Sequence, residues 1–252
     1  MIKISAVIIT FNEEKNIGRC IDSLTGLVDE IVVLDSFSTD KTKTIALEKS
    51  VKFYENPFEG HIQQKNKAVS LASYDYVLSL DADEYLSEEL RKSIAAVKEK
   101  PLQQAYSMNR LSSFKGRWIR ATDWYPDKKI RLWDRAVGHW GGNNPHDTVI
   151  INKGIAIKHL DGDLLHVAYD GIEPLFQKAY AYALIYARDK RGRRRITAFT
   201  IMYKTFYSFF RNFILKLGFT CGYDGFIISC AASVYTFYKY SFLREYNARR
   251  KN

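Results

Sequence analysis

The chain has 252 residues, 46% of them hydrophobic, and its 38 Lys and Arg side chains exceed its 28 Asp and Glu side chains by ten. A chain this rich in hydrophobic residues can bury a core, which excludes intrinsic disorder. The excess charge lies entirely in residues 170–252, with 15 basic and 5 acidic side chains, whereas residues 1–169 hold 23 of each. Because most of the chain carries no net charge, a uniformly basic nucleic-acid-binding protein is disfavoured.

The cysteines and the N-terminal residues indicate the compartment. Cys20, Cys221 and Cys230 form no Cys-x-x-Cys pair, so we expect neither a disulfide framework nor a zinc site, and a reducing compartment is favoured. The short apolar run of residues 4–9 is followed by polar residues, which disfavours a signal peptide or anchor. The uncharged stretch 225–238 has 14 residues, whereas a spanning helix needs about 20. We therefore expect a cytoplasmic protein without a transmembrane helix.

The first hundred residues alternate between strand-like and helix-like patterns. The expected strands cover residues 4–10, 30–35, 51–55 and 76–80, and the expected helices cover residues 14–24, 39–50, 61–72 and 88–100. This alternation with short connections is typical of a parallel sheet covered by helices on both faces. Ligands of such sheets bind beyond the carboxyl ends of the strands, a position held here by Asn12, Asp35 and Asp81.

The pattern changes after residue 103. Short strands and loops are expected over residues 104–166, and helices over 175–188, 196–217 and 223–246, with a basic loop over 190–195. We therefore predict an α/β domain over residues 1–169, with halves 1–100 and 101–169, followed by a basic, aromatic-rich helical region over residues 170–252.

An Asp-Ala-Asp triplet directly follows the fourth expected strand. Asp81 and Asp83 are two residues apart, so their carboxylates can point toward one position. Such oxygen ligands suit Mg²⁺ or Mn²⁺, which bind few carboxylates and complete their coordination with substrate phosphates. A polar turn that caps the next helix explains the triplet equally well, so the triplet alone leaves both interpretations open.

Polar segments also follow the first two expected strands. Residues 10–14 offer groups that can contact a nucleotide base, and Asp35 can accept hydrogen bonds from a base or a ribose. Both segments also suit helix capping: Glu13 and Glu14 are favourable in a first helical turn, and the Ser/Thr/Asp cluster 35–40 is typical of turns. Neither segment decides the function by itself.

Together, in this order and spacing, these segments resemble a known family. The segments that carry the resemblance are TFNEE (10–14), EIVVLDSFSTDKT (30–42), QKNKA (64–68) and LSLDADE (78–84), and the family is that of inverting family 2 glycosyltransferases of the GT-A fold. Later segments resemble the β-glucosyltransferases of bacterial lipopolysaccharide core assembly: residues 116–120, 124–127, 129–133, 145–147 and 164–166. The resemblance implies an α/β, Rossmann-like fold of the GT-A type, with a mostly parallel sheet, helices on both faces and a helical C-terminal region.

The resemblance also implies roles for individual residues near the donor. The residues that would hold the nucleotide sugar are Thr10, Asn12, Glu13, Asp35, Lys65 and Asp81, with Lys65 near the diphosphate. In the D-x-D-like motif, Asp83 matches the usual metal ligand and Asp81 accompanies it. A Mg²⁺ or Mn²⁺ ion there would bridge the diphosphate and neutralise charge on the leaving nucleotide.

Inversion at the anomeric carbon requires one general base for the acceptor hydroxyl. The resemblance places a carboxylate in the later acceptor loop, and Asp147 is the candidate, with His146 as a second base candidate or an orienting donor. The alternative is a loop aspartate satisfied by backbone amides. Two departures from the family pattern are Asp147, where Glu is more usual, and Phe37, where Gly is usual.

The middle of the chain offers candidates for acceptor binding. Arg117, Arg120 and Arg131 carry guanidinium groups that suit acceptor phosphates, and we predict an acceptor-binding role for them. The four Trp residues are interpreted as half-buried core residues rather than sugar platforms. His61, His139, His159 and His166 have no metal-ligand spacing and are interpreted as structural.

The C-terminal region combines cations with aromatic residues. A basic loop over 190–195 precedes a segment in which Phe206, Phe209, Phe210 and Phe213 alternate with Lys204, Arg211 and Lys216. A solvated helix face explains the charges without any partner, but an amphipathic helix at an anionic membrane explains both residue types. We expect peripheral association with the inner face of the cytoplasmic membrane.

The sequence thus predicts a metal-dependent hexosyltransferase. The expected reaction moves glucose from UDP-glucose onto a lipopolysaccharide core or a related lipid-linked cell-envelope saccharide. The alternatives are sugar transfer to a polyprenyl phosphate, a sugar-nucleotide nucleotidyltransferase and a nucleic-acid-binding module. The nucleotidyltransferase class usually has a Gly-rich, basic N-terminal loop, which this sequence lacks, and the neutral charge of residues 1–169 disfavours nucleic acid as a partner.

Overall fold

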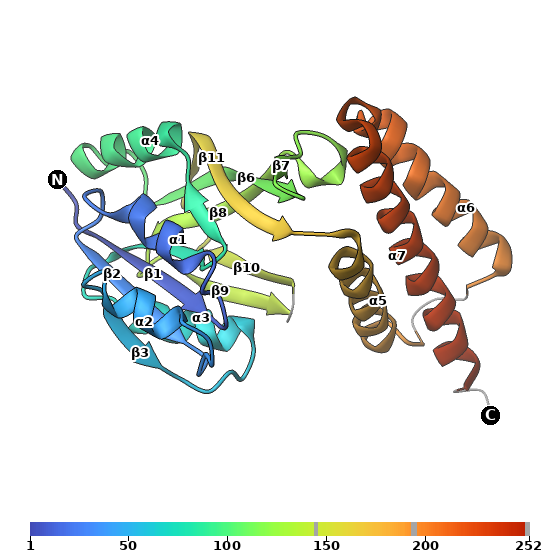
Figure 1. Cartoon of the computed structure of the whole chain (residues 1–252), viewed down its shortest axis with the longest axis horizontal. Coiled ribbons are helices and arrows are strands. Elements are labelled where there is room, and N and C mark those ends of the chain that lie inside the picture. The colour runs from blue at the N-terminus through green and yellow to red at the C-terminus, as the bar shows by residue number, and fades with distance from the viewer. Residues whose placement is uncertain (144–145, 193–195, 250–252) are drawn as a thin grey trace. The chain divides into compact units, whose positions relative to one another are not determined.

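The chain forms two compact units in the computed structural model, which describes residues 1–143, 146–192 and 196–249 (Figure 1). Unit 1 consists of Met1–Arg110 and Asp127–Val167, and unit 2 consists of Leu111–Pro126 and the chain from Ala168 onward. Unit 2 therefore combines the C-terminal helices with a segment from the middle of the chain.

The first four strands of unit 1 form the parallel half of its sheet. They are β1 (Ile4–Thr10), β2 (Glu30–Asp35), β3 (Lys52–Glu55) and β4 (Tyr76–Asp81), in the order β3-β2-β1-β4. Thr10 is opposite Asp35, and Ile9 is opposite Asp81. The carboxyl ends of β1, β2 and β4 therefore meet at one edge of the sheet.

Helices cover both faces of this parallel half. They are α1 (Ile17–Leu24), α2 (Thr42–Leu47), α3 (His61–Ser70) and α4 (Glu88–Glu99). Ile4 and Ile8 of β1 pack in a core with α1 and α4, whereas Val7 packs in a second core with α3. Successive side chains of a strand point to opposite faces, so the apolar run from Ala6 to Ile9 in β1 fits burial of both faces. The expected cover of helices on both faces is confirmed.

Two helices begin later than the sequence pattern predicts. α1 begins at Ile17 rather than at residue 14, and α2 begins at Thr42 rather than at residue 39. The backbone N–H of Glu13 donates to Thr42 Oγ1 at 2.8 Å, and that of Glu14 donates to an Asp40 carboxylate oxygen at 3.0 Å. The residues before both helices therefore hydrogen-bond across to each other, which ties the starts of the two helices together.

The second half of the sheet contains its antiparallel pairs. Its strands are β5 (Glu84–Leu86), β6 (Ala105–Phe114), β7 (Arg117–Trp118), β8 (Asp127–Asp134) and β11 (Ile157–Tyr169), which extend the order as β4-β8-β6-β11-β5, with β7 paired to β6. The hairpin of β9 (Gly138–Asn143) and β10 (His146–Ile151) is separate. No crossover helix separates β6, β7 and β8, and strands joined by short loops pair antiparallel. The nine-stranded sheet is therefore mixed, and its antiparallel pairs are β4–β8, β8–β6, β6–β7 and β5–β11.

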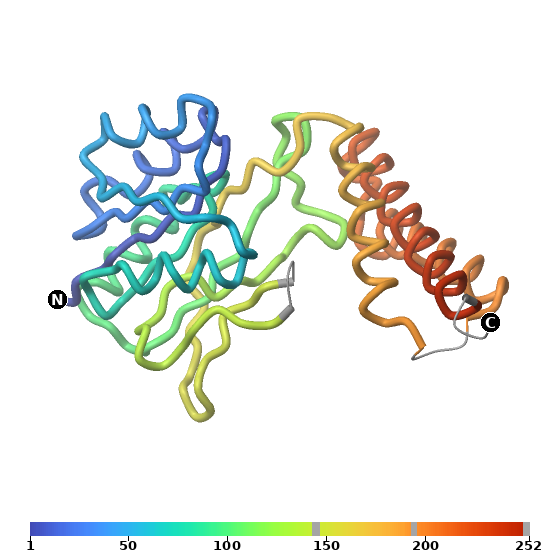
Figure 2. The backbone as a smooth tube through the Cα atoms, turned by 90° about the horizontal axis from the view of Figure 1, so that it is seen from below, coloured from blue at the N-terminus to red at the C-terminus, as the bar shows by residue number. Residues whose placement is uncertain are grey.

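Unit 2 is built mainly from helices. They are α5 (Ile172–Asp189), α6 (Ala198–Phe210) and α7 (Gly222–Arg249), with a π-helical turn η2 (Arg211–Leu215) and a 3₁₀ turn η3 (Gly218–Cys221) between α6 and α7, and a 3₁₀ turn η1 (Thr122–Trp124) in the central segment. α7 packs against both α5 and α6, as both views show (Figures 1 and 2). Phe114 and Ile119 of the central segment share a core with Leu175, Ile228 and Ala231.

Within the described residues, no single helix has the length and hydropathy of a membrane span. One pair, Ala198–Leu215 with Gly218–Ala248, reaches that length and composition only when taken together across the bend between its members.

Candidate active site

The candidate site lies in unit 1, where the carboxyl ends of β1, β2 and β4 meet. Asp81 is the last residue of β4, and its backbone N–H donates to Glu84 Oε2 at 3.0 Å. Thr10 ends β1, and its hydroxyl is buried with no hydrogen-bond partner. The structure thus brings polar residues from three strand ends to one edge, as the parallel arrangement requires.

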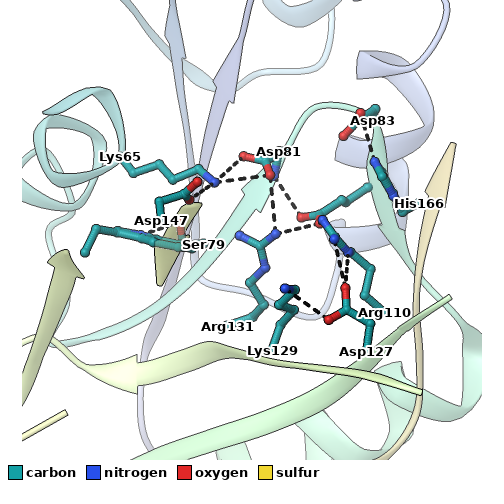
Figure 3. A network of polar contacts seen from close by, with 12 residues as sticks. Lys65, Ser79, Asp81, Asp83, Arg110, Asp127, Lys129, Arg131, Asp147 and His166 are labelled. Atoms are coloured by element: carbon teal, nitrogen blue, oxygen red, sulfur yellow. Dashed lines mark hydrogen bonds and ion pairs between the residues drawn. The ribbon is translucent and has the colours of Figure 1, made fainter. Parts of the chain in front are cut away.

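Lys65 lies between two predicted site carboxylates. Its side chain, on α3, is only 5% exposed, and its Nζ is 3.0 Å from Asp81 Oδ1 and 2.7 Å from Asp147 Oδ2 (Figure 3). The same Nζ lies 4.3 Å from the centre of the Trp140 ring, close enough for a cation–π interaction. Since Asp147 belongs to β10, Lys65 joins two segments that are far apart in the sequence.

Arg131 of β8 holds the other side of Asp81. Its Nη2 is 3.3 Å from Asp81 Oδ2 and 2.6 Å from Glu84 Oε1, and its side chain is 3% exposed. Burial raises the pKa of Asp81, but the charges of Lys65 and Arg131 outweigh burial and hold that pKa below its usual range. Burial lowers the pKa of Arg131, but the charges of Glu84 and Asp81 outweigh it and hold that pKa above its usual range. Asp81 and Arg131 are therefore both charged at neutral pH.

A second layer of charges surrounds Glu84, which is fully buried. Arg110 lies 3.7 Å from Glu84 Oε1 and donates through Nε and Nη2 to Asp127 Oδ2, at 3.0 and 2.8 Å. Lys129 Nζ is 3.0 Å from Asp127 Oδ1 (Figure 3). Cations and carboxylates thus alternate from Lys65 to Lys129, which keeps the buried charges paired.

Asp83 lies against His166 of β11. The Nε2 atom of His166 is 3.3 Å from Asp83 Oδ2 (Figure 3). The pairing of β11 with β5 places His166 opposite Glu84, which brings its side chain to the D-x-D motif. Burial raises the pKa of Glu13, the hydrogen bond from Asn16 opposes this, and the charge of Asp83 adds to the rise. Glu13 therefore also lies near this motif.

The two predicted nucleotide loops are tied to each other. Asn12 donates its backbone N–H to Ser38 Oγ at 2.8 Å, and its side-chain oxygen accepts from the backbone N–H of Thr39 at 2.8 Å. Asp35 is fully buried and accepts from the backbone N–H of Ser38 at 2.7 Å. Phe37 has φ of 61°, in the left-handed region that favours glycine. This conformation explains physically why Gly is usual at that position.

The three predicted acceptor arginines fall in different units. Arg131 is buried in unit 1 with Asp81 and Glu84 as its partners. Arg117 and Arg120 belong to unit 2, where Arg117 pairs with Asp224 at 2.7 Å and Arg120 donates to the Tyr125 hydroxyl at 3.2 Å. The contacts of Arg131 are those of a residue that positions Asp81. The acceptor-binding role of all three remains a prediction.

His146 lies on β10 next to Asp147, but its side chain is outside the part of the chain that the structure describes. Its role as a second base candidate therefore remains a prediction. The same holds for residues 193–195 of the predicted basic loop, which also lie outside the described residues.

The sequence interpretation missed several residues of this network. His166 was interpreted as structural and Trp140 as a core residue, and Glu84 and Arg110 received no role. Glu84 directly follows the D-x-D motif, and that adjacency was a usable signal. His166 is 83 residues beyond Asp83 in the sequence, and only the register of β11 on β5 brings the two together.

The carboxylates of Asp81 and Asp83 fit a divalent cation whose coordination shell is completed by the substrate. Asp81 Oδ1 and Asp83 Oδ1 are buried and accept no hydrogen bond, although Lys65 Nζ is 3.0 Å from the former. Such oxygens are costly to bury without a partner. Among the described residues, no group of three or more His, Cys, Asp or Glu side chains is placed to hold a metal. Mg²⁺ commonly uses one or two carboxylates plus substrate phosphates, so the two aspartates are a sufficient protein set.

The mixed sheet, the aspartate pair at the end of β4 and the facing carboxylate of Asp147 define a glycosyltransferase of the GT-A fold. The chain belongs to glycosyl transferase family 2, whose model matches residues 5–161. The fold and family that the sequence motifs implied are thus confirmed.

Relatives span nearly the whole chain. The chain is 32% identical to a protein named as an uncharacterised glycosyltransferase in Rickettsia typhi, over 100% of this chain and 90% of the relative. It is 27% identical to the lipopolysaccharide core biosynthesis glycosyltransferase LpsC of Rhizobium meliloti, over 93% of this chain and 89% of the relative. Among solved structures, S. aureus TarS is similar with a TM-score of 0.50 and 18% identity, over 88% of this chain and 46% of that chain, and this similarity shows the fold.

Proposed function

We propose that this glycosyltransferase moves glucose from UDP-glucose onto the lipopolysaccharide core or a related lipid-linked cell-envelope saccharide, with Mg²⁺ or Mn²⁺ and with inversion at the anomeric carbon. Membership of family 2 supports sugar transfer. The similarity to a relative named for lipopolysaccharide core biosynthesis supports the acceptor class. The resemblance of residues 116–133 to β-glucosyltransferases supports glucose as the sugar.

The observation that carries the proposal is the set of side chains around Asp81. Lys65 supplies a buried positive charge beside two carboxylates, Asp81 and Asp147, at one strand-end edge. A diphosphate needs such a cation, and an attacking hydroxyl needs such a carboxylate. Both requirements are met within a few ångströms, in a part of the fold where α/β sheets bind their ligands.

Asp83 and Asp81 would hold the divalent ion. The ion would neutralise the charge that develops on the leaving diphosphate. Asp83 Oδ1 supports this assignment, since it is buried and accepts no hydrogen bond. Arg131 keeps Asp81 ionised and in place through a pair of charge-assisted contacts.

Asp147 is proposed as the general base. The acceptor hydroxyl oxygen forms the new bond to the anomeric carbon, and its proton passes to a carboxylate oxygen of Asp147. The bond between that carbon and the diphosphate breaks, and its electron pair leaves on UDP. Lys65, 2.7 Å from Asp147, holds this carboxylate toward the donor position.

A donor screen tests the proposal. Purified protein freed of metal with a chelator is mixed with Mg²⁺ or Mn²⁺ and each of several nucleotide sugars, and nucleoside diphosphate release is measured with and without core saccharide. We expect release from UDP-glucose that requires both the metal and the acceptor. Release from a different donor only would overturn the donor assignment, and pyrophosphate release from a nucleoside triphosphate would overturn the reaction class. A single-sugar product that extracts into organic solvent would instead identify a polyprenyl phosphate acceptor.

Two variants test the residue roles in the same assay. Asp83→Ala should abolish metal-dependent donor binding and turnover, whereas Asp75→Ala, at the exposed opposite end of β4, should retain both. Asp147→Asn should bind donor normally and lose turnover by about 10²–10⁴-fold. Normal turnover by Asp83→Ala would refute the metal assignment, and normal turnover by Asp147→Asn would place the base elsewhere.

A further inference from the structure

One face of α6 is apolar and exposed along its whole length. The residues on this outer stripe recur three and four positions apart and include no charged side chain: Phe199, Met202, Tyr203, Phe206, Tyr207, Phe210 and Ile214. Phe199, Met202 and Phe206 are 77%, 72% and 71% exposed. Apolar side chains scattered singly on a surface are ordinary, but a continuous stripe of this length marks an interaction surface.

The face of α6 that packs on α7 carries hydroxyl groups beside the aromatic ring of Phe209, which packs on Phe226. Ser208 donates to the backbone oxygen of Ala232 at 3.2 Å, and Ser233 of α7 donates to the backbone oxygen of Thr205 at 2.9 Å. Asn212, in the following turn, is 2% exposed and donates to the backbone oxygen of Ser208 at 3.0 Å. Hydroxyl and amide groups thus share this interface with aromatic rings, whereas a helix in water places mainly apolar residues there.

The turn η3 between α6 and α7 also packs closely against α7. A Cβ atom added at Gly225 would lie 1.9 Å from the backbone oxygen of Gly218, so only glycine allows this contact. The tip between the helices presents further exposed apolar side chains: Leu215, Leu217, Phe219, Tyr223 and Phe226. Small residues and interhelical hydrogen bonds inside, with apolar residues outside, are characteristic of helix pairs packed in lipid.

The sequence pattern places the apolar face of this segment slightly differently. It groups Phe209 and Phe213 with Phe206 and Phe210, but in the structure Phe209 and Phe213 pack on each other and on Phe226, with ring centres 5.4–6.0 Å apart. Residues adjacent to an outward position turn inward because a helix rotates by about 100° per residue. The outer stripe is therefore Phe206 and Phe210 with their neighbours at helical spacing.

Charges lie at the two ends of the stripe rather than within it. Lys190 and Arg191 precede α6, and the exposed Lys216 follows Ile214 and Leu215. α7 itself carries Asp224, Lys239 and Arg244, which disfavours its passage through a hydrocarbon core. The arrangement is that of a hairpin lying in one leaflet, with cations reaching anionic headgroups and apolar residues below them.

We propose that the outer stripe of α6 and the tip between α6 and α7 insert into one leaflet of an anionic phospholipid membrane. Insertion of this surface into a membrane does not depend on the sugar-transfer reaction. The occupant is lipid rather than protein because the face pairs an uncharged apolar stripe with flanking cations, in a region with 15 basic and 5 acidic side chains.

Vesicle flotation of the purified full-length protein tests the proposal. We expect the protein to float with vesicles of phosphatidylcholine and phosphatidylglycerol, to bind pure phosphatidylcholine less, and to remain partly bound at about 0.5 M salt, because insertion of apolar groups is not screened. The double variant Met202→Glu/Phe206→Glu should lose about tenfold or more of its binding. Since both side chains are exposed, its circular dichroism and melting temperature should match the wild type.

Leu102→Glu is the matched control. Leu102 is an apolar side chain of unit 1 that is 57% exposed, so the same change there should leave vesicle binding unaltered. Equal binding by the double variant and the wild type would overturn insertion, as would complete release by salt. Light scattering of the protein without vesicles tests whether a second copy of the chain binds the stripe instead of lipid. A wild-type dimer that the double variant dissociates, together with no flotation, would identify the stripe as a contact between two copies and overturn the lipid assignment.

Discussion

Asp81 keeps its charge because cations from both halves of the sheet face it. Lys65 reaches it from a helix of the parallel half, and Arg131 reaches it from a strand of the antiparallel half. Each cation also holds a second carboxylate, Asp147 or Glu84. Removing one member of such a buried set leaves its partner charged and unpaired, which costs more than the pair itself contributes.

Arg131→Met should therefore destabilise the protein strongly. Glu84 would be left fully buried with only the more distant Arg110 as a cation, at a cost of about 3–5 kcal/mol in the free energy of unfolding. Adding Glu84→Gln should recover part of that loss. The measurement is urea-induced unfolding of both single variants and the double variant, and strictly additive effects would show that the two side chains do not interact.

Glu30, at the start of β2, provides a test by pH. Burial raises its pKa, but hydrogen bonds from Lys52, Ser5 and Ser73 outweigh burial and lower that pKa from 4.5 to about 2. The folded state thus binds the proton less well than the unfolded state. The resulting stability is fully present above pH about 4.5 and is lost as the pH falls from about 4.5 to about 2.

Glu30→Gln should accordingly lower the free energy of unfolding at pH 7, by about 2 kcal/mol once solvent screening of the exposed Lys52 is allowed for. The difference from the wild type should shrink as the pH falls through this window. Glu48→Gln, at an exposed position of unit 1, is the control and should leave the pH dependence unaltered. A deficit that stays constant down to pH 2 would mean that the Glu30 charge contributes nothing.

At the scale of the elements, α1 and α6 place their apolar residues differently. α1 buries Ile17, Cys20, Ile21 and Leu24 against the sheet, which is the pattern of a helix in water. α6 turns hydroxyl groups and Phe209 toward α7 and exposes a stripe of aromatic rings. Apolar residues three and four positions apart thus form part of the protein core in unit 1 and an exposed apolar surface in unit 2.

Two glycines should respond in opposite directions to alanine. Gly225→Ala should destabilise unit 2 by about 2 kcal/mol or more, because its Cβ would overlap the backbone oxygen of Gly218 and the backbone has to move. Gly18→Ala, in α1, should be neutral or stabilise by up to about 1 kcal/mol, because its Cβ would make only ordinary contacts at 3.4 and 3.5 Å and alanine favours helix. Thermal unfolding of both variants checks the pair, and equal shifts in melting temperature would contradict it.

At the scale of the whole molecule, chemistry and charge lie in different units. All described members of the polar network around Asp81 belong to unit 1, and the excess positive charge belongs to the C-terminal region. Substitutions in the two units should therefore affect different measurements. Variants of the polar network around Asp81 should change turnover on every acceptor, and outer-stripe variants should change only turnover that depends on a membrane.

The double variant Met202→Glu/Phe206→Glu separates membrane-dependent turnover from turnover on a soluble acceptor. On a soluble, deacylated core saccharide its kcat/KM should equal that of the wild type, whereas on the same saccharide anchored in anionic vesicles it should fall by about tenfold. Leu102→Glu should match the wild type on both acceptors. A loss on the soluble acceptor as well would show that the stripe supports catalysis directly, which the division into units does not predict.

The sequence by itself determined the elements of the parallel half, the Asp81–Asp83 motif and the family. These follow from local patterns: apolar periodicity, turn residues and short motifs whose members lie within a few residues of each other. The same reasoning indicated Lys65 and Asp147 as site residues through their resemblance to family positions. It could not indicate that these two side chains form one ion pair.

Only the tertiary structure decided which distant residues meet. His166 reaches Asp83 through the register of β11 on β5, and Arg131 turns to Glu84 rather than to solvent because β8 packs beside β4. The outward direction of Phe206 likewise depends on which face of α6 contacts α7. A helical pattern specifies that two faces differ, but it does not specify which of them is buried, since that choice depends on the neighbour and on the surrounding solvent or lipid.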